Sequence, residues 1–162
     1  MEATVTKKLF ILTLLILASC GLFESETGVS DTHAFLSSSI GSFSTIPVYY
    51  PEDYSSNTPV IYLLNGLGAD ASAWGSGIDL AKEAFDRNII FVSMTAGDNT
   101  YTNHYSDPNK QYEDYVLEVV EEIEVEYALE IDSTKRALCG ISNGGGGAVY
   151  ILSRHPDIFA AC

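Results

Sequence analysis

The chain has 162 residues, a length that corresponds to about one domain. Apolar residues make up 46% of it, which allows a sizeable core and argues against global disorder. The net charge is −14, with 8 basic against 22 acidic residues. This excess argues against nucleic acid as a partner, because phosphate contacts require clustered Lys and Arg.

Residues 1–19 have the pattern of an export signal. Lys7 and Lys8 supply positive charge, and the apolar run that follows is too short to span a membrane, for which about 20 residues are needed. The run ends in Leu17-Ala18-Ser19-Cys20, which resembles the lipobox of bacterial lipoproteins. That resemblance implies a lipid on Cys20 and a membrane-anchored protein of the bacterial cell envelope. Ordinary secretion with cleavage near Ser19 is the alternative.

Residues 20–34 are largely polar and are predicted to form a flexible tether. Behind it, residues 35–162 are predicted to form the folded domain. Its elements alternate: strands at 46–50, 60–64 and 89–94, helices at 73–87 and 113–129, and a loop at 96–111. Acidic side chains of the second helix are expected to form a solvated face, not a metal site. The alternation predicts an α/β fold, with a mostly parallel sheet covered by helices on both faces.

The segment that begins at Gly140 has the Gly-x-Ser-x-Gly pattern of a nucleophile elbow. The apolar run 137–139 precedes it as a short strand, and a helical stretch that Pro156 terminates follows it. Side chains at positions 140 and 144 would collide with the neighbouring strand and helix, which explains the glycines. The N-terminus of the helix that follows points at the serine and favours negative charge that develops there. We therefore predict that Ser142 is a nucleophile; a glycine-rich turn that merely contains a serine is the alternative.

Acyl transfer through a serine requires donors for the oxyanion. One is predicted to be the backbone N–H of Asn143, the residue after the nucleophile. The other is predicted to be that of Leu67, in the turn after strand 60–64, where Gly66 and Gly68 allow the backbone to point at the site. A plain strand-ending turn is the alternative.

The three cysteines match no zinc or haem pattern and no paired framework. Cys139 lies inside the predicted elbow strand, and it is expected to be a small buried residue.

From about Ile46 onward the chain resembles the putative esterase family of α/β-hydrolases, which includes S-formylglutathione hydrolase (esterase D), tributyrin and feruloyl esterases, and the antigen 85 mycolyltransferases. The resemblance implies the α/β-hydrolase fold and serine-dependent ester chemistry. It rests on four segments: Val48-Tyr49-Tyr50-Pro51-Glu52-Asp53-Tyr54; Pro59 to Gly68 with Trp74 downstream; Tyr101-Thr102-Asn103 with Tyr112-Glu113-Asp114-Tyr115; and Gly140 to Ala148 with Arg154-His155-Pro156-Asp157-Ile158-Phe159.

Three residues depart from the family pattern. Asn143 replaces the usual methionine, and we expect tolerance there because only its backbone is required. Gly146 replaces a usual aromatic residue, which removes packing beside the elbow. Asn65 replaces the more common histidine, although Asn-Gly-Leu is close to the Asp-Gly-Leu of the mycolyltransferase branch.

The family's triad acid and histidine follow the serine on later strands. The sequence has 20 residues after Ser142, and its one histidine there, His155, lies in what the family has as a structural turn. His104 precedes the serine, in a loop that often lines the acyl pocket. The chain is therefore expected to be the N-terminal part of an α/β-hydrolase, truncated after the nucleophile helix and inactive on its own.

The predicted function is a serine carboxylic-ester hydrolase with no cofactor and no metal. Its expected partners are a small-molecule ester or acylated carbohydrate substrate and a lipid anchor to the membrane. The alternatives are an acyltransferase of the mycolyltransferase type and a non-catalytic binding lipoprotein that keeps the hydrolase fold.

Overall fold

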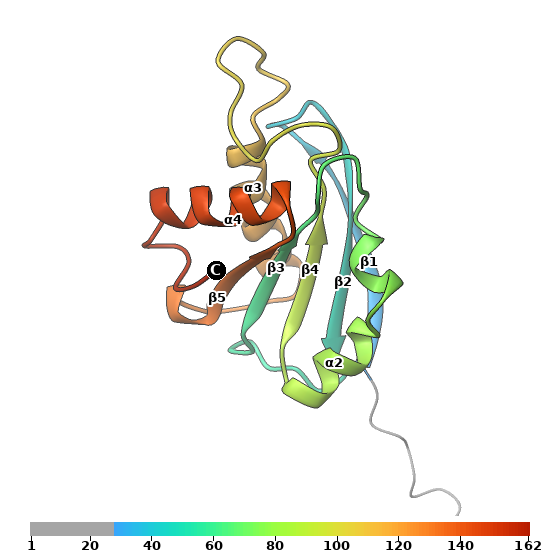
Figure 1. Cartoon of the computed structure of the whole chain (residues 1–162). Coiled ribbons are helices and arrows are strands. Elements are labelled where there is room, and N and C mark those ends of the chain that lie inside the picture. Colours follow the sequence, from blue (N-terminus) through green and yellow to red (C-terminus); the bar gives the residue numbers. More distant parts are fainter. Residues whose placement is uncertain (1–27) are drawn as a thin grey trace, which may run out of the picture.

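The computed structural model describes residues 28–162 (Figure 1). The export signal, Cys20 and the first part of the predicted tether lie outside the described residues. Ten elements follow in chain order: β1 (Gly28–Ser37), β2 (Ser42–Pro51), β3 (Val60–Leu64), η1 (Ala73–Ser76), α2 (Leu80–Arg87), β4 (Ile90–Met94), α3 (Tyr112–Glu126), η2 (Ser133–Lys135), β5 (Arg136–Gly140) and α4 (Asn143–Arg154).

The five strands form one mixed sheet in the order β1-β2-β4-β3-β5. The neighbours β4, β3 and β5 are parallel, as predicted, so their carboxyl ends meet at the upper edge in Figure 1. The first two strands are antiparallel to each other, and β2 is antiparallel to β4. A four-residue turn joins β1 to β2, and such a short connection permits only antiparallel pairing.

Helices cover both faces of the sheet, as predicted (Figure 1). Alternate residues of β3 point to opposite faces, so that Tyr62 and Leu64 join the large core with α3 and α4, whereas Leu63 joins a smaller cluster with Leu80 and Ala84 of α2. The α4 helix packs on β5 and β3, next to the predicted elbow. No helix among residues 28–162 is long and apolar enough to cross a membrane.

Strands β3, β4 and β5 and helix α3 lie close to their predicted positions. The predicted helix 73–87 is wrong as a single element, because it is divided into η1 and α2. Gly77 lies at the break, and the Asp79 carboxylate accepts a hydrogen bond from the Lys82 N–H at 3.1 Å, which caps the start of α2.

The predicted tether 20–34 is wrong at its end, because β1 begins at Gly28. Residues Ser30, Asp31 and Thr32 are exposed and polar, so β1 has no alternating hydrophobic pattern by which to be recognised. The strand is defined instead by its pairing with β2 along all ten residues.

The expectation that Cys139 is buried is also wrong. Its side chain points to the face that α2 covers, but α2 packs against β1, β2 and β4 and does not extend over β5. Its neighbour in β5, Leu138, points to the other face and is buried under α4, as the alternation of a strand requires.

Candidate active site

Ser142 occupies a strained turn between β5 and α4. Its backbone angles, φ 56° and ψ −117°, define a conformation that residues other than glycine seldom adopt. Holding a residue in such a conformation costs about 1–3 kcal/mol of folding free energy. The turn is held from both sides: the Ile141 N–H donates to the Leu64 carbonyl at 3.3 Å, and the Gly146 N–H donates to the Ser142 carbonyl at 3.1 Å. The serine is exposed at the carboxyl edge of the parallel strands. This is the geometry that the elbow pattern predicts.

The predicted collisions at the two elbow glycines are confirmed. A Cβ on Gly140 would lie 2.1 Å from the Gly144 carbonyl oxygen. A Cβ on Gly144 would lie 2.0 Å from the Leu64 carbonyl oxygen, at the end of β3. Glycine at these positions therefore allows α4 to approach both β5 and β3, and this approach aims the N-terminus of α4 at the space above the strand ends.

The turn after β3 lies next to Ser142. A Cβ on Gly66 would lie 3.7 Å from the Ser142 Cβ, so the Leu67 peptide begins beside the serine. Gly68 has a φ of 72°, and its N–H donates to the Gly97 carbonyl at 2.9 Å, which bends the turn toward the loop after β4. The structure thus brings Leu67, Ser142 and Asn143 together. Among residues 28–162, the N–H groups of Leu67 and Asn143 donate to no other protein atom.

Asn65, at the start of this turn, is a buried anchor whose role the sequence does not reveal. Its Nδ2 donates to the carbonyls of Asp70 (2.5 Å) and Met94 (2.9 Å), which ties both ends of the turn to the end of β4. Tyr101, 1% exposed, adds a hydroxyl that lies 3.3 Å from the Asn65 carbonyl oxygen and 3.4 Å from that of Met94. Burial raises the pKa of the Tyr101 phenol, so the group is neutral at ordinary pH.

In the part of the chain that the structure describes, each of the three histidines contacts groups other than Ser142. His155 lies 13 residues further along, at the far end of α4, or about 20 Å at 1.5 Å per helical residue. His33 lies on β1, at the opposite edge of the sheet from β5, between Glu122 and Glu126. The Nδ1 of His104 accepts from the N–H groups of Ser106 and Asp107, at 3.3 and 3.1 Å.

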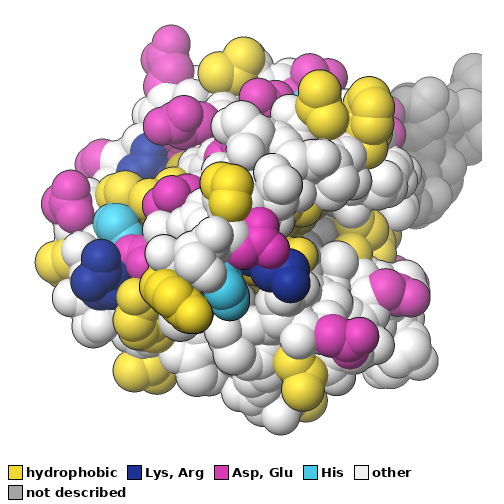
Figure 2. Space-filling view, turned by 90° about the horizontal axis from the view of Figure 1, so that it is seen from above, with side chains coloured by type: hydrophobic (Ala, Val, Ile, Leu, Met, Phe, Trp, Pro, Cys, Tyr) yellow, Lys and Arg dark blue, Asp and Glu magenta, His cyan; other side chains and the backbone are white. Residues whose placement is uncertain are grey.

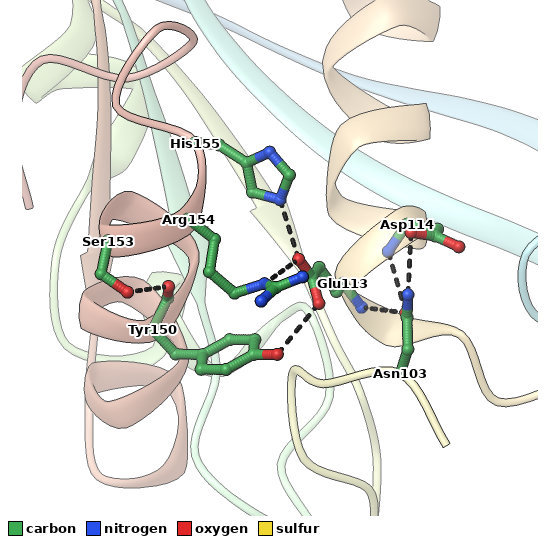
Figure 3. A network of polar contacts seen from close by, with 7 residues as sticks. All are labelled: Asn103, Glu113, Asp114, Tyr150, Ser153, Arg154 and His155. Carbon is green, nitrogen blue, oxygen red and sulfur yellow. Dashed lines mark hydrogen bonds and ion pairs between the residues drawn. The ribbon is translucent and has the colours of Figure 1, made fainter. Parts of the chain in front are cut away.

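A buried carboxylate joins α3 to the end of α4 (Figure 3). Glu113, 4% exposed, accepts hydrogen bonds from Arg154 Nε (2.6 Å) and the Tyr150 hydroxyl (3.0 Å), and its Oε1 lies 2.8 Å from His155 Nε2. Asn103 caps the same turn of α3, because its Oδ1 accepts from the Glu113 N–H at 3.1 Å. This network explains the Arg-His-Pro segment as a structural clamp, with His155 as one of its members.

Glu113→Gln is expected to lower the free energy of unfolding at pH 7 by about 2 kcal/mol, because it weakens three charge-assisted contacts at once. Burial alone raises the pKa of Glu113, but the hydrogen bonds from Arg154, His155 and Tyr150 outweigh it and lower the pKa below its usual value. Its stabilisation is therefore present above the unfolded-state pKa of about 4.3 and is lost as pH falls through the folded-state pKa.

Urea unfolding at pH 7 and at pH 3.5 checks this expectation. The difference between wild type and Glu113→Gln should shrink at the lower pH. Glu121→Gln, the same change at an exposed position of α3, is the control and should change stability by less than about 0.5 kcal/mol. A difference that grows on acidification would contradict the assigned direction of the pKa shift.

Two exposed aliphatic side chains lie close to Ser142 in the two turns that meet there. Leu67, which follows Gly66, and Ile141, which precedes Ser142, are 61% and 60% exposed. Figure 2 looks down on this edge of the sheet and shows hydrophobic side chains among acidic ones, with basic side chains in few places. Residues 28–162 contain no group of three His, Cys, Asp or Glu side chains placed to hold a metal ion.

Comparison with known proteins agrees with this geometry. The profile of the family described as "Putative esterase" matches residues 37–162. An S-formylglutathione hydrolase of Arabidopsis thaliana is 27% identical over 163 residues, which cover 87% of this chain and 57% of the plant protein. The chain thus spans a little more than half the length of this relative.

Solved structures share the fold. Serine hydrolase F of Staphylococcus aureus, FphF, which binds fluorophosphonate, superposes with a TM-score of 0.76 at 22% identity, over 83% of this chain and 55% of its own. A ferulic acid esterase superposes with a TM-score of 0.69 at 26% identity, over 83% of this chain and 58% of the esterase. MPT51 of Mycobacterium tuberculosis superposes with a TM-score of 0.67 at 21% identity, over 81% of this chain and 48% of MPT51. The fold is that of an α/β-hydrolase, and the chain belongs to the putative esterase family.

Proposed function

We propose that this protein is a serine carboxylic-ester hydrolase that acts through an acyl-enzyme on Ser142. The Ser142 Oγ attacks the ester carbonyl, and the N–H groups of Leu67 and Asn143 bind the resulting oxyanion. The alcohol leaves with a proton, and water then attacks the acyl-enzyme to release the acid and regenerate the serine. The observation that carries the proposal is the strained backbone of Ser142 beside Gly66; the next residue after each, Asn143 and Leu67, has an N–H that donates to no acceptor within residues 28–162.

The base that this mechanism requires is proposed to lie outside the 162 residues. His33, His104 and His155 are each engaged elsewhere, and two of them lie about 20 Å from the serine by the spacing of helical residues and strands. We propose that a histidine and its orienting carboxylate are supplied by a further segment. The histidine takes the serine proton, then gives it to the leaving alcohol.

The substrate is proposed to be a small ester with an apolar group next to the carbonyl. Leu67 and Ile141, in the two turns that meet at Ser142, have exposed aliphatic side chains. Aromatic esters such as those of ferulic acid, the substrate named for one structural relative, have this character. The net charge of −14 argues against nucleic acid as a partner.

Covalent labelling tests the assignment. A fluorophosphonate reacts with an activated serine and leaves its phosphonyl group on the Oγ, so peptide mass mapping of the complete natural protein should locate the adduct on Ser142. Absence of an adduct on Ser142, with the protein folded, would favour a binding protein that retains the hydrolase fold.

The lipid anchor is a separate proposal that rests on Leu17-Ala18-Ser19-Cys20. In a bacterial host the mature protein should incorporate radioactive palmitate and partition into detergent, and Cys20→Ser should abolish both. Cys139→Ser is the matched control, because it removes an exposed thiol far along the chain and should leave labelling intact. A wild-type protein that is exported but unlabelled would contradict the anchor and favour ordinary secretion.

A further inference from the structure

Segment 99–101, in the loop after β4, contacts both sides of the candidate oxyanion site. On one side, the Asn143 Nδ2 donates to the Asn99 carbonyl at 3.0 Å. On the other, the Tyr101 hydroxyl reaches the carbonyls of Asn65 and Met94, at the start of the turn that carries Leu67. One short segment therefore connects Asn143 with Asn65, the residue at which the turn that carries Leu67 begins.

The segment is itself held firmly. The Asn99 N–H and Nδ2 both donate to the Ala96 carbonyl, at 2.9 and 3.1 Å, and Nδ2 also reaches the Tyr112 hydroxyl at 3.1 Å. The Tyr101 ring packs so closely on α4 that a Cβ added to Gly147 would lie 2.7 Å from its atoms. The Asn99 carbonyl is thus a fixed acceptor, against which another group can be oriented.

We propose that the Asn143 side chain is a positioning residue for the reaction. The hydrogen bond from its side-chain amide to the Asn99 carbonyl fixes the first residue of α4. It thereby fixes the direction of the Asn143 backbone N–H that faces the oxyanion. Oxyanion donors act over 2.7–3.1 Å, so a small rotation of this peptide weakens transition-state binding and leaves substrate binding largely unchanged. The inference rests on the proposed function, and it replaces the expectation that only the backbone of Asn143 is required.

The test compares Asn143→Leu with Asn103→Leu in the complete natural protein. Leucine has the same branched side-chain skeleton as asparagine, with two methyl groups in place of the amide oxygen and nitrogen, so it cannot form the hydrogen bond. Asn143→Leu should lower kcat about tenfold with KM changed less than twofold, and it should weaken a trifluoromethyl ketone inhibitor, which mimics the oxyanion, by the same factor. Asn103→Leu removes the same amide from the cap of α3, so it should lower the unfolding temperature and leave kcat unchanged.

Ser142→Ala distinguishes failure of the positioning role of Asn143 from failure of the proposed function. If Ser142→Ala is inactive and Asn143→Leu has the kcat of wild type, the positioning role is overturned and the proposed function stands. If both Asn→Leu variants lose kcat in proportion to stability, Asn143 is merely structural and the inference is overturned. If Ser142→Ala keeps the wild-type rate, the proposed function fails and the inference fails with it.

Discussion

Ser142→Ala is expected to lower kcat for hydrolysis of a p-nitrophenyl ester by about 10⁴-fold or more in the complete protein. The variant lacks the oxygen that forms the acyl-enzyme, and the two N–H groups retain only the stabilisation that they give to direct attack by water. KM should change little, because the hydroxyl contributes mainly to the covalent step. Steady-state kinetics on purified wild type and variant provide the measurement, with gel-based fluorophosphonate labelling as a second readout.

Ser153→Ala is the control for this experiment. Ser153 lies on the same helix, but at its far end, where its hydroxyl donates to the Tyr150 carbonyl at 2.7 Å. The same loss of a hydroxyl should there leave kcat and labelling at wild-type levels. Turnover by Ser142→Ala within tenfold of wild type would show that another group is the nucleophile, and the elbow geometry would then need a different explanation.

The parts of the fold that local sequence determines were predictable. Strand β3 fills 60–64 because five apolar residues lie between Pro59 and the Asn65-Gly66 turn, and a strand buried on both faces needs no alternation. The elbow was predictable for a related reason. A glycine two residues before and two after Ser142 is a local pattern, and both close approaches involve backbone atoms that any sequence would supply.

The remaining features depend on contacts between distant residues. The polar strand β1 exists because β2 pairs with it, and Cys139 is exposed because α2 does not extend over β5. The Asn143 side chain donates a hydrogen bond to a carbonyl that lies 44 residues earlier in the sequence, and the Tyr101 hydroxyl donates one to the Asn65 carbonyl, 36 residues earlier. No spacing in the sequence indicates these pairs. The departure of Asn143 from the family's methionine was visible, but its side-chain role required the position of the Asn99 carbonyl.

Gly144→Ala and Gly146→Ala are expected to have opposite effects, although they are the same chemical change two residues apart in α4. At Gly144 the new methyl would meet the Leu64 carbonyl oxygen at 2.0 Å and the Asn65 carbonyl oxygen at 2.7 Å. These are backbone atoms at the end of β3, which cannot rotate away. The variant should therefore lose about 3 kcal/mol or more of unfolding free energy.

At Gly146 no atom lies within 4 Å of the new methyl, and the position is exposed. Alanine in a helix interior is favoured over glycine by about 0.5–1 kcal/mol, so this variant should be slightly more stable than wild type. Urea unfolding of the complete protein measures both changes. A Gly144→Ala variant as stable as wild type would show that α4 does not lie against the end of β3.

Gly144→Ala and Gly146→Ala also test whether the contact between α4 and β3 sets the position of Ser142 or serves stability alone. To relieve the clash at Gly144, α4 must move away from β3, and Ser142 moves with it because the Gly146 N–H holds the Ser142 carbonyl. The hydroxyl then leaves its place beside Gly66, so fluorophosphonate labelling of the folded fraction should slow by about 100-fold, as expected for a displacement of about 1 Å. Gly146→Ala should label at the wild-type rate. Normal labelling of folded Gly144→Ala would mean that the contact with β3 serves stability alone and does not set the position of Ser142.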